Sequence, residues 1–235
     1  MIAAAAVRAP GGLVRHLQRT DTNEQVIERA DLSVGCAIET EEAIADFAAI
    51  GAAQHVEKSL LHIAISPALP LTLSQERRMI ALVREVYGIP AAHPSHVVQH
   101  IKPGPTVRPS HYHLVFPRYD SDRGKLISSS FTHIKNERAS LQLELEFGHP
   151  LVPGPHLDTV RDTLAKERPD LAARLDGLSP PTRKNDALKV GDIAKANDHD
   201  LDLTDFQVRI LAAWTADRLT PTSLSRARAR LAHGT

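Results

Sequence analysis

A chain of 235 residues, 42% hydrophobic and 24% charged, is long enough to bury one core, or one domain with a smaller appendage. Its 28 basic and 28 acidic residues cancel, so the composition excludes a strongly basic nucleic-acid-binding protein and leaves only local charge to support such a function. The single cysteine, Cys36, excludes an internal disulfide framework and a zinc–thiolate cluster. Without a secretory signal or an apolar stretch of about twenty residues, we expect a cytoplasmic protein that does not insert into a membrane.

The elements predicted up to residue 157 alternate irregularly between strands and helices. Residues 1–12 end in Pro-Gly-Gly and are expected to be mobile. In chain order, we then expect one or two helical turns (13–20), a strand (24–29), a helix (41–54), a strand (59–66), a helix (74–88), two strands (95–101 and 111–116), a turn into a short strand (118–128) and a helix (134–148). Ser74 is the expected N-cap of the helix 74–88, and Gly88 its end.

Beyond residue 157 the pattern changes to short helices, with later helices expected at 206–219 and 223–232. The chain lacks the regular strand–helix alternation of a parallel sheet. We therefore predict an α+β fold, with a mainly antiparallel sheet flanked by helices in a domain over residues 1–157 and a helical C-terminal extension over residues 158–235.

Two histidines stand one residue apart in the stretch RPSHYHLVFPRYD, residues 108–120. Alternate side chains of a strand share a face, so His111 and His113 are expected to point the same way. His100 ends the preceding strand and reaches the same face if the two strands pair. Three imidazoles from adjacent strands make a metal site with open coordination positions. In a chain with 13 histidines such a pair also arises by chance, and that alternative stays open.

Local charge around this pair is positive. Residues 99–138 carry seven basic and three acidic side chains, a net charge of +4 in a chain whose total is zero. The basic residues are Lys102, Arg108, Arg118, Arg123, Lys125, Lys135 and Arg138, and the acidic ones are Asp120, Asp122 and Glu137. A phosphate-bearing substrate requires such an excess. An ordinary solvated loop and helix face has the same composition.

A second polar cluster lies in LVRHLQRTDTNEQV, residues 13–26. His16 is flanked by Arg15 and Arg19 and is followed by Glu24. Arginines can hold a phosphate and a carboxylate can orient an imidazole ring, so His16 is a candidate catalytic residue. The alternative is a histidine packed at the surface beside leucines.

Three stretches in order carry a resemblance to a known family: VVQHI, SHYHLVFPRYDSDRGKLISSS and HIKNERASLQLELEFGH. Through them the chain resembles the relaxase, or plasmid mobilization nuclease, family of the HUH endonucleases. The resemblance covers residues 13–157. It implies a ferredoxin-like antiparallel sheet and metal-dependent, site- and strand-specific nicking and joining of DNA, which initiates conjugative plasmid transfer. It also implies that His100, His111 and His113 hold a divalent ion, Mn²⁺ or Mg²⁺, with Zn²⁺ as a further option.

The resemblance assigns further roles. The N-terminal motif of the family normally carries a tyrosine nucleophile, and His16 occupies that position here. The resemblance therefore implies a 5′-phosphohistidine intermediate. It also implies that Glu24 orients or deprotonates the His16 ring. None of the three tyrosines lies in this motif, and Tyr112 is expected to face away from its neighbouring histidines. The implied partners are single-stranded DNA at an origin of transfer, accessory relaxosome proteins and a type IV secretion coupling protein. The expected DNA-binding residues are Arg15, Arg19, Arg118, Lys135 and Arg138.

Two other functions fit the same residues. One is a DNA- or origin-binding module that has lost its nucleophile and does not cleave. The other is a zinc hydrolase that acts on a small substrate, since three histidines and a water also serve that chemistry. The absence of a phosphate-binding Gly-x-x-x-x-Gly-Lys loop indicates that the chain has no helicase motor of its own.

Overall fold

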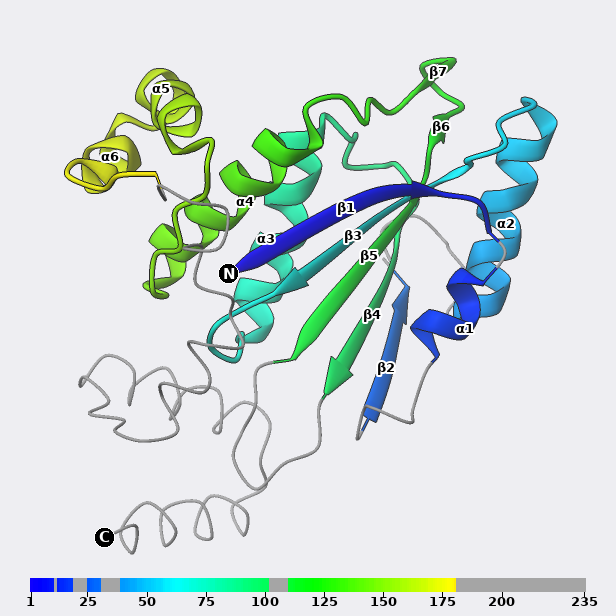
Figure 1. Cartoon of the computed structure of the whole chain (residues 1–235). Helices are drawn as coiled ribbons and strands as arrows, with labels where there is room; N and C mark the ends of the chain where they lie inside the picture. The colour runs from blue at the N-terminus through cyan, green and yellow to red at the C-terminus, as the bar shows by residue number, and fades with distance from the viewer. Residues whose placement is uncertain (11, 19–24, 31–38, 102–109, 181–235) are drawn as a thin grey trace, which may run out of the picture.

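Five antiparallel strands form the central sheet of this computed structural model, which describes residues 1–10, 12–18, 25–30, 39–101 and 110–180 (Figure 1). In spatial order the strands are β1 (Ile2–Arg8), β3 (Leu60–Ser66), β5 (His111–Pro117), β4 (His96–Ile101) and β2 (Gln25–Ala30). Each strand is antiparallel to its neighbours. The predicted α+β fold with an antiparallel sheet flanked by helices is confirmed.

Helices cover both faces of this sheet. The helices α3 (Leu73–Tyr87) and α4 (Thr132–Phe147) pack on one face, where Ile63, Leu114 and Phe116 form part of the main core. The helices α1 (Leu13–Leu17) and α2 (Thr40–Ala53) lie on the other face, in a smaller core with Val98 and Val115 (Figure 1). Successive strand residues face opposite ways, so β5 contributes Leu114 to one core and Val115 to the other.

The connectivity gives this sheet a split β-α-β arrangement. From β3 the chain runs through α3, β4, β5 and α4, with both helices on the same face. In a β-α-β-β-α-β unit, the last strand forms the edge beside the first. Here β1 takes that edge position, beside β3, although it is the first strand of the chain. The strand β2 extends the opposite edge, beside β4.

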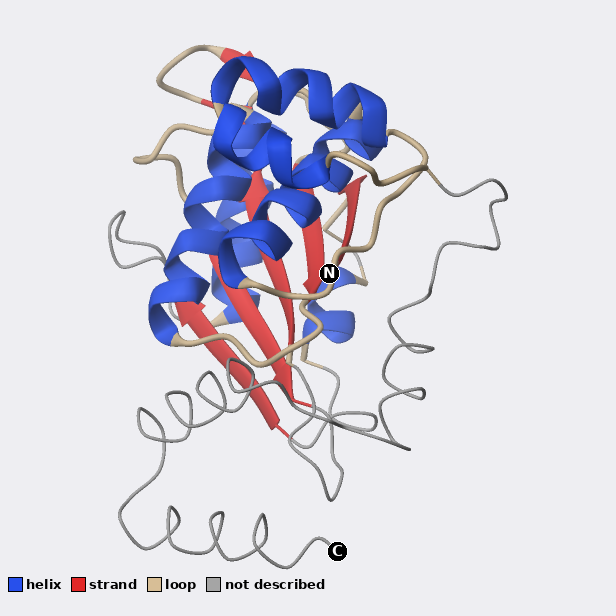
Figure 2. Cartoon of the chain, turned by 90° about the vertical axis from the view of Figure 1, so that its left-hand side faces the viewer, coloured by secondary structure: helices blue, strands red, loops and turns tan. Residues whose placement is uncertain are grey.

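Shorter elements complete the described chain. The strands β6 (Tyr119–Asp120) and β7 (Lys125–Leu126) form a hairpin at the far end of β5 from His111. The helices α5 (Leu157–Glu167) and α6 (Pro169–Ala172), followed by a 3₁₀ turn (Ala173–Leu175), pack against α4, and a view turned by 90° shows this helical layer over the sheet (Figure 2). They confirm a helical region after residue 157, whereas the helices predicted at 206–219 and 223–232 lie outside the described residues.

The described helices include none that is both long enough and apolar enough to cross a bilayer.

Two local predictions were wrong. Residues 1–12 were expected to be mobile, but Ile2–Arg8 is an edge strand that pairs with β3 along its whole length and packs against α4. The alanines have little β propensity of their own, so tertiary pairing decides their structure. The N-cap of α3 is Thr72 rather than Ser74: the Thr72 hydroxyl accepts from the Gln75 backbone N–H at 3.3 Å, and the Gln75 side chain accepts from the Thr72 N–H at 2.9 Å. Gly88 does end the helix, in the left-handed conformation.

Candidate metal centre

The strand pair β4–β5 brings three histidines together on one face of the sheet. His100 lies directly opposite His111 in the antiparallel register, and His113 follows two residues later on the same strand face. His100 and His113 are each 2% exposed, while His111 is half-buried and borders solvent. The predicted convergence of the three histidine side chains is confirmed.

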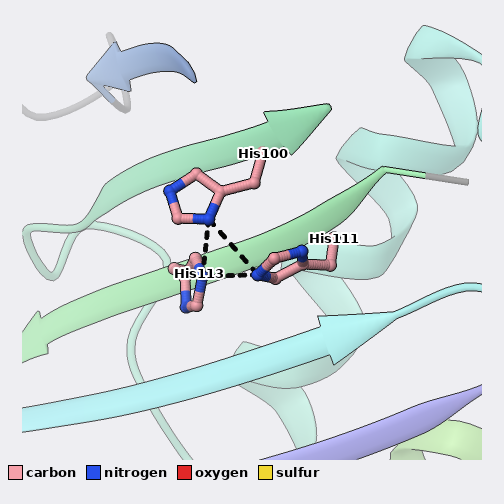
Figure 3. A group of neighbouring side chains, drawn as sticks. All are labelled: His100, His111 and His113. Atoms are coloured by element: carbon pink, nitrogen blue, oxygen red, sulfur yellow. Dashed lines mark hydrogen bonds between the residues drawn. The ribbon is translucent and has the colours of Figure 1, made fainter. Parts of the chain in front are cut away.

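One nitrogen from each ring points to a common centre (Figure 3). His100 Nδ1 lies 3.3 Å from His111 Nε2 and 3.3 Å from His113 Nε2, and the last two atoms are 2.9 Å apart. Hydrogen bonds alone do not account for this triangle, because each ring nitrogen has a single in-plane proton or lone pair and can satisfy only one partner. Three ring nitrogens that can each present a lone pair to one point could together hold a metal ion.

The spacing fits a transition-metal ion. With metal–nitrogen bonds of about 2.0–2.1 Å, two imidazole nitrogens stand about 2.9 Å apart at a right angle and about 3.3 Å apart at the tetrahedral angle. The three observed separations match these two values. Imidazole suits Zn²⁺ and related transition-metal ions, and His111 is the half-buried member of the group.

His100 and His113 each have a second contact that fixes the orientation of the ring. His100 Nε2 lies 2.6 Å from the carbonyl oxygen of Leu17, to which it donates, so the lone pair is left on Nδ1. His113 Nδ1 lies 2.8 Å from Nε2 of His62, on the neighbouring strand β3. Contacts of this kind hold a metal ligand in the required tautomer.

Burial keeps the deepest rings neutral. Desolvation, followed by repulsion from His111, His62, His100 and His16, lowers the pKa of His113 to about 2. Desolvation, with smaller contributions from nearby cationic groups, lowers the pKa of His62 to about 4. A histidine binds a metal ion only when it is neutral, so this environment favours ligation over protonation.

The helix α1 brings His16 to this group. Leu13 and Leu17 are buried beneath the helix, and His16 is exposed. The His16 ring meets His113 edge-on, with 5.2 Å between ring centroids and an angle of 81° between planes, and its centroid lies 6.2 Å from that of His62. The predicted nucleophile and the three predicted ligands therefore belong to one cluster.

The predicted DNA-binding residues are dispersed. Arg15 is exposed on α1, next to His16, whereas Arg19 and Glu24 lie outside the described residues. Arg118 follows the last residue of β5, seven residues and about 23 Å along the strand from His111.

Lys135 and Arg138 are on α4, on the sheet face opposite the histidines. The Lys135 ammonium donates to the Ser128 carbonyl at 3.0 Å and lies over the Tyr87 ring, and Arg138 is paired with Glu167 at 2.5 Å. The structure does not bring Arg118, Lys135 or Arg138 together with the histidine group.

Two residues of this region were not predicted from the sequence. His62 is a lone histidine in a strand, and nothing in the sequence says that β3 pairs with β5. Arg8 ends β1 opposite Leu60, exposed, on the face that carries His62, and its charge contributes to the lowered pKa of His62. The prediction for Tyr112 is confirmed: it faces away from the histidines and donates from its hydroxyl to Glu76 Oε1 at 2.8 Å.

Comparison with protein-family models, curated proteins and solved structures yields no match to this chain. The chemistry of the site is therefore inferred from its own residues.

Proposed function

We propose that this protein is a metal-dependent nuclease of the relaxase type, which nicks and rejoins single-stranded DNA through His16. The observation that carries the proposal is the convergence of three imidazole nitrogens beside a fourth, exposed imidazole whose ring lies 5.2 Å from His113. Phosphoryl transfer to a protein nucleophile needs both parts, a centre of positive charge for the phosphate and a group that attacks phosphorus.

The three histidines would hold the ion, and His16 would carry the covalent step. A divalent ion bound there stabilises the charge on the non-bridging phosphate oxygens, worth several kcal/mol in such chemistry. One ring nitrogen of neutral His16 attacks phosphorus in line, and the P–O3′ bond breaks with its electron pair. The proton released from the other ring nitrogen balances the proton gained by the leaving 3′ oxygen. The product is a 5′-phosphohistidine and a free 3′-hydroxyl.

The same steps in reverse rejoin the strand. The 3′-hydroxyl attacks phosphorus, the P–N bond breaks and His16 is restored, because the energy of the original ester is kept in the P–N bond. A nicking and joining enzyme requires this reversibility, and a simple hydrolase does not. Glu24 remains the predicted partner of the His16 ring, and the relaxosome and coupling-protein partners also remain predictions.

Charge near the histidines supports an anionic substrate. Arg15 is exposed beside His16, and Arg8 is exposed on the strand face that carries His62. Arg15 precedes the predicted nucleophile, and the charge of Arg8 contributes to the lowered pKa of His62, whereas Lys135 and Arg138 belong to α4 on the opposite face of the sheet. We therefore assign the DNA path to Arg8 and Arg15, together with Arg19 as predicted, rather than to α4.

The test uses a randomised pool of single-stranded DNA labelled at the 3′ end, because the labelled fragment is the one that stays on the protein. The full chain is incubated with this pool and Mn²⁺ and run on a denaturing gel. The expected result is a labelled adduct, labile to acid, that is absent in His16→Ala and present in His133→Ala, which removes an exposed histidine from α4. Sequencing of the trapped strands then gives the preferred site.

The two alternatives give different results in the same experiment. Binding of DNA without any adduct would favour the non-cleaving origin-binding module. Cleavage of a small phosphoester without DNA, unchanged in His16→Ala, would favour the zinc hydrolase. An adduct that persists in His16→Ala would contradict the assignment of the nucleophile.

A further inference from the structure

His62 is a buried histidine that is neither one of the three ligands nor the nucleophile. It lies on β3 and is 5% exposed, and its ring lies beside that of His113, with 25° between the ring planes and 5.0 Å between ring centroids. Its Nε2 atom is 2.8 Å from Nδ1 of His113. The antiparallel register places Ala64 opposite His113, so His62 approaches from a diagonal position of the neighbouring strand.

The hydrogen bond between these rings has two arrangements, and only one of them permits metal binding. If His62 donates from Nε2, the neutral His113 ring carries its proton on Nε2, the atom that faces His100 and His111. A protonated Nε2 has no lone pair and cannot be a ligand. If His113 donates from Nδ1, its Nε2 lone pair is available and His62 is the acceptor.

We propose that His62 is the positioning residue of the metal centre: it accepts from His113 Nδ1–H and so holds the Nε2 lone pair of His113 toward the ion. This inference rests on the metal site of the proposed function. Ligating histidines usually donate their other ring N–H to a carboxylate, a backbone carbonyl or a water. Here His100 follows that rule with the carbonyl of Leu17, and a second imidazole takes the acceptor role for His113.

Because the acceptor is a neutral ring, it must be held in one tautomer itself. His62 then carries its own proton on Nδ1, and the His62–His113 pair contributes no net charge beside the ion. A carboxylate in the same place would add a negative charge. The centre consequently keeps the full charge of the cation for an anionic substrate.

The experiment measures Mn²⁺ affinity by electron paramagnetic resonance for four proteins: wild type, His62→Ala, His62→Gln and His96→Gln. Loss of an outer-shell partner typically weakens metal binding about 10–100-fold, and we expect that loss in His62→Ala. The amide oxygen of a glutamine side chain can accept from His113, so His62→Gln is expected to retain affinity within a few-fold of wild type. His96→Gln removes a buried histidine bonded to Thr40, about 13 Å along β4 from His100, and controls for lost packing.

A second readout is independent of substitution. Nitrogen-15 spectra of the zinc-loaded wild type, labelled at histidine, report which ring nitrogens carry protons. We expect protons on His113 Nδ1 and His62 Nδ1. A proton on His62 Nε2 would overturn the inference even if the alanine variant does not fold.

The outcomes separate this inference from the proposed function. If His62→Ala binds Mn²⁺ as tightly as wild type, His62 is not a positioning residue, while the three-histidine centre stands. If wild type binds no divalent ion, both the centre and the role of His62 are wrong. If metal binding follows the expected order but no DNA adduct forms, the role of His62 stands and the nuclease proposal fails.

Discussion

The carbonyl oxygen of Leu17 accepts a hydrogen bond from His100 Nε2 at a distance of 2.6 Å. The last carbonyl groups of a helix have no partner within the helix, and here one of them accepts from a candidate metal ligand. Leu17 is also the residue after His16, so the contact that holds His100 fixes the end of the short helix that carries the predicted nucleophile. The position of the predicted nucleophile and the orientation of the candidate ligand are thus linked by one buried contact between α1 and β4.

Loosening α1 is therefore expected to weaken metal binding. Leu17 is fully buried, and Leu17→Ala should lower the free energy of unfolding by about 2–5 kcal/mol and weaken Mn²⁺ binding as well. Leu164, equally buried in the separate core beneath α5, is the matched control. Leu164→Ala should cost similar stability by chemical denaturation and leave the Mn²⁺ affinity unchanged. Equal metal affinities in the two variants would argue against the link through α1.

The chemistry of the adduct is expected to follow the residue at position 16. A phosphohistidine P–N bond is labile in acid, whereas a phosphotyrosine ester is not. His16→Tyr should therefore convert an acid-labile DNA adduct into an acid-stable one, provided that the phenol reaches phosphorus from the same helix. Acid treatment of gel-purified adducts measures the change. Identical acid lability in both proteins would mean that another residue forms the bond.

Salt dependence is expected to identify the cations that contact DNA. On a single strand each phosphate contact contributes about 0.7 to the slope of log K against log salt concentration. Arg8→Ala and Arg15→Ala should each reduce that slope by about 0.7, whereas Arg138→Ala, behind the sheet and paired with Glu167, should leave it unchanged. Fluorescence anisotropy with a labelled single strand at several salt concentrations gives the slopes. A reduced slope for Arg138→Ala alone would move the DNA path to α4.

Acid is expected to destabilise the fold through its buried histidines. Burial, followed by repulsion from the Met1 ammonium, lowers the pKa of His149 from 6.5 to about 4, and neither of its ring nitrogens has a hydrogen-bond partner among the described residues. The unfolded chain takes up this proton near pH 6.5 and the folded chain only near pH 4. The contribution of neutral His149 to the free energy of unfolding is therefore complete above pH 6.5 and is lost as the pH falls toward 4.

Denaturation at a series of pH values checks this expectation. His149→Leu should flatten part of the fall in stability below pH 6.5. His133→Leu, which alters an exposed histidine of α4, should keep the wild-type profile. The remaining slope in His149→Leu is expected from His62 and His113, whose pKa values burial lowers in the same direction. Superimposable profiles for wild type and His149→Leu would contradict the prediction.

The parts of the site that a sequence can predict are those that depend on local pairing. His100, His111 and His113 belong to consecutive strands, and consecutive antiparallel strands usually pair, so strand periodicity was sufficient to bring them together. The contact of His62 with His113 depends on pairing between β3 and β5, which are separated in the chain by α3 and β4. No periodicity encodes such a non-consecutive neighbour, and His62 was therefore not predicted.

Arg118 and Arg138 do not gather at the histidines, because sequence neighbours need not be neighbours in space. Arg118 is close to His113 in the chain, but an extended strand carries it to the opposite end of the sheet. Arg138 follows on a helix that covers the other face. In contrast, Arg8 is distant in sequence and lies on the histidine face, because the alanine-rich edge strand pairs with β3.

The most direct test of the central claim is anomalous diffraction from crystals of the full chain soaked in Mn²⁺. A single strong peak is expected within bonding distance of His100 Nδ1, His111 Nε2 and His113 Nε2, with the His16 ring on the open side of the ion. A peak elsewhere, no peak at the three histidines, or a His16 ring turned away from the ion would contradict it.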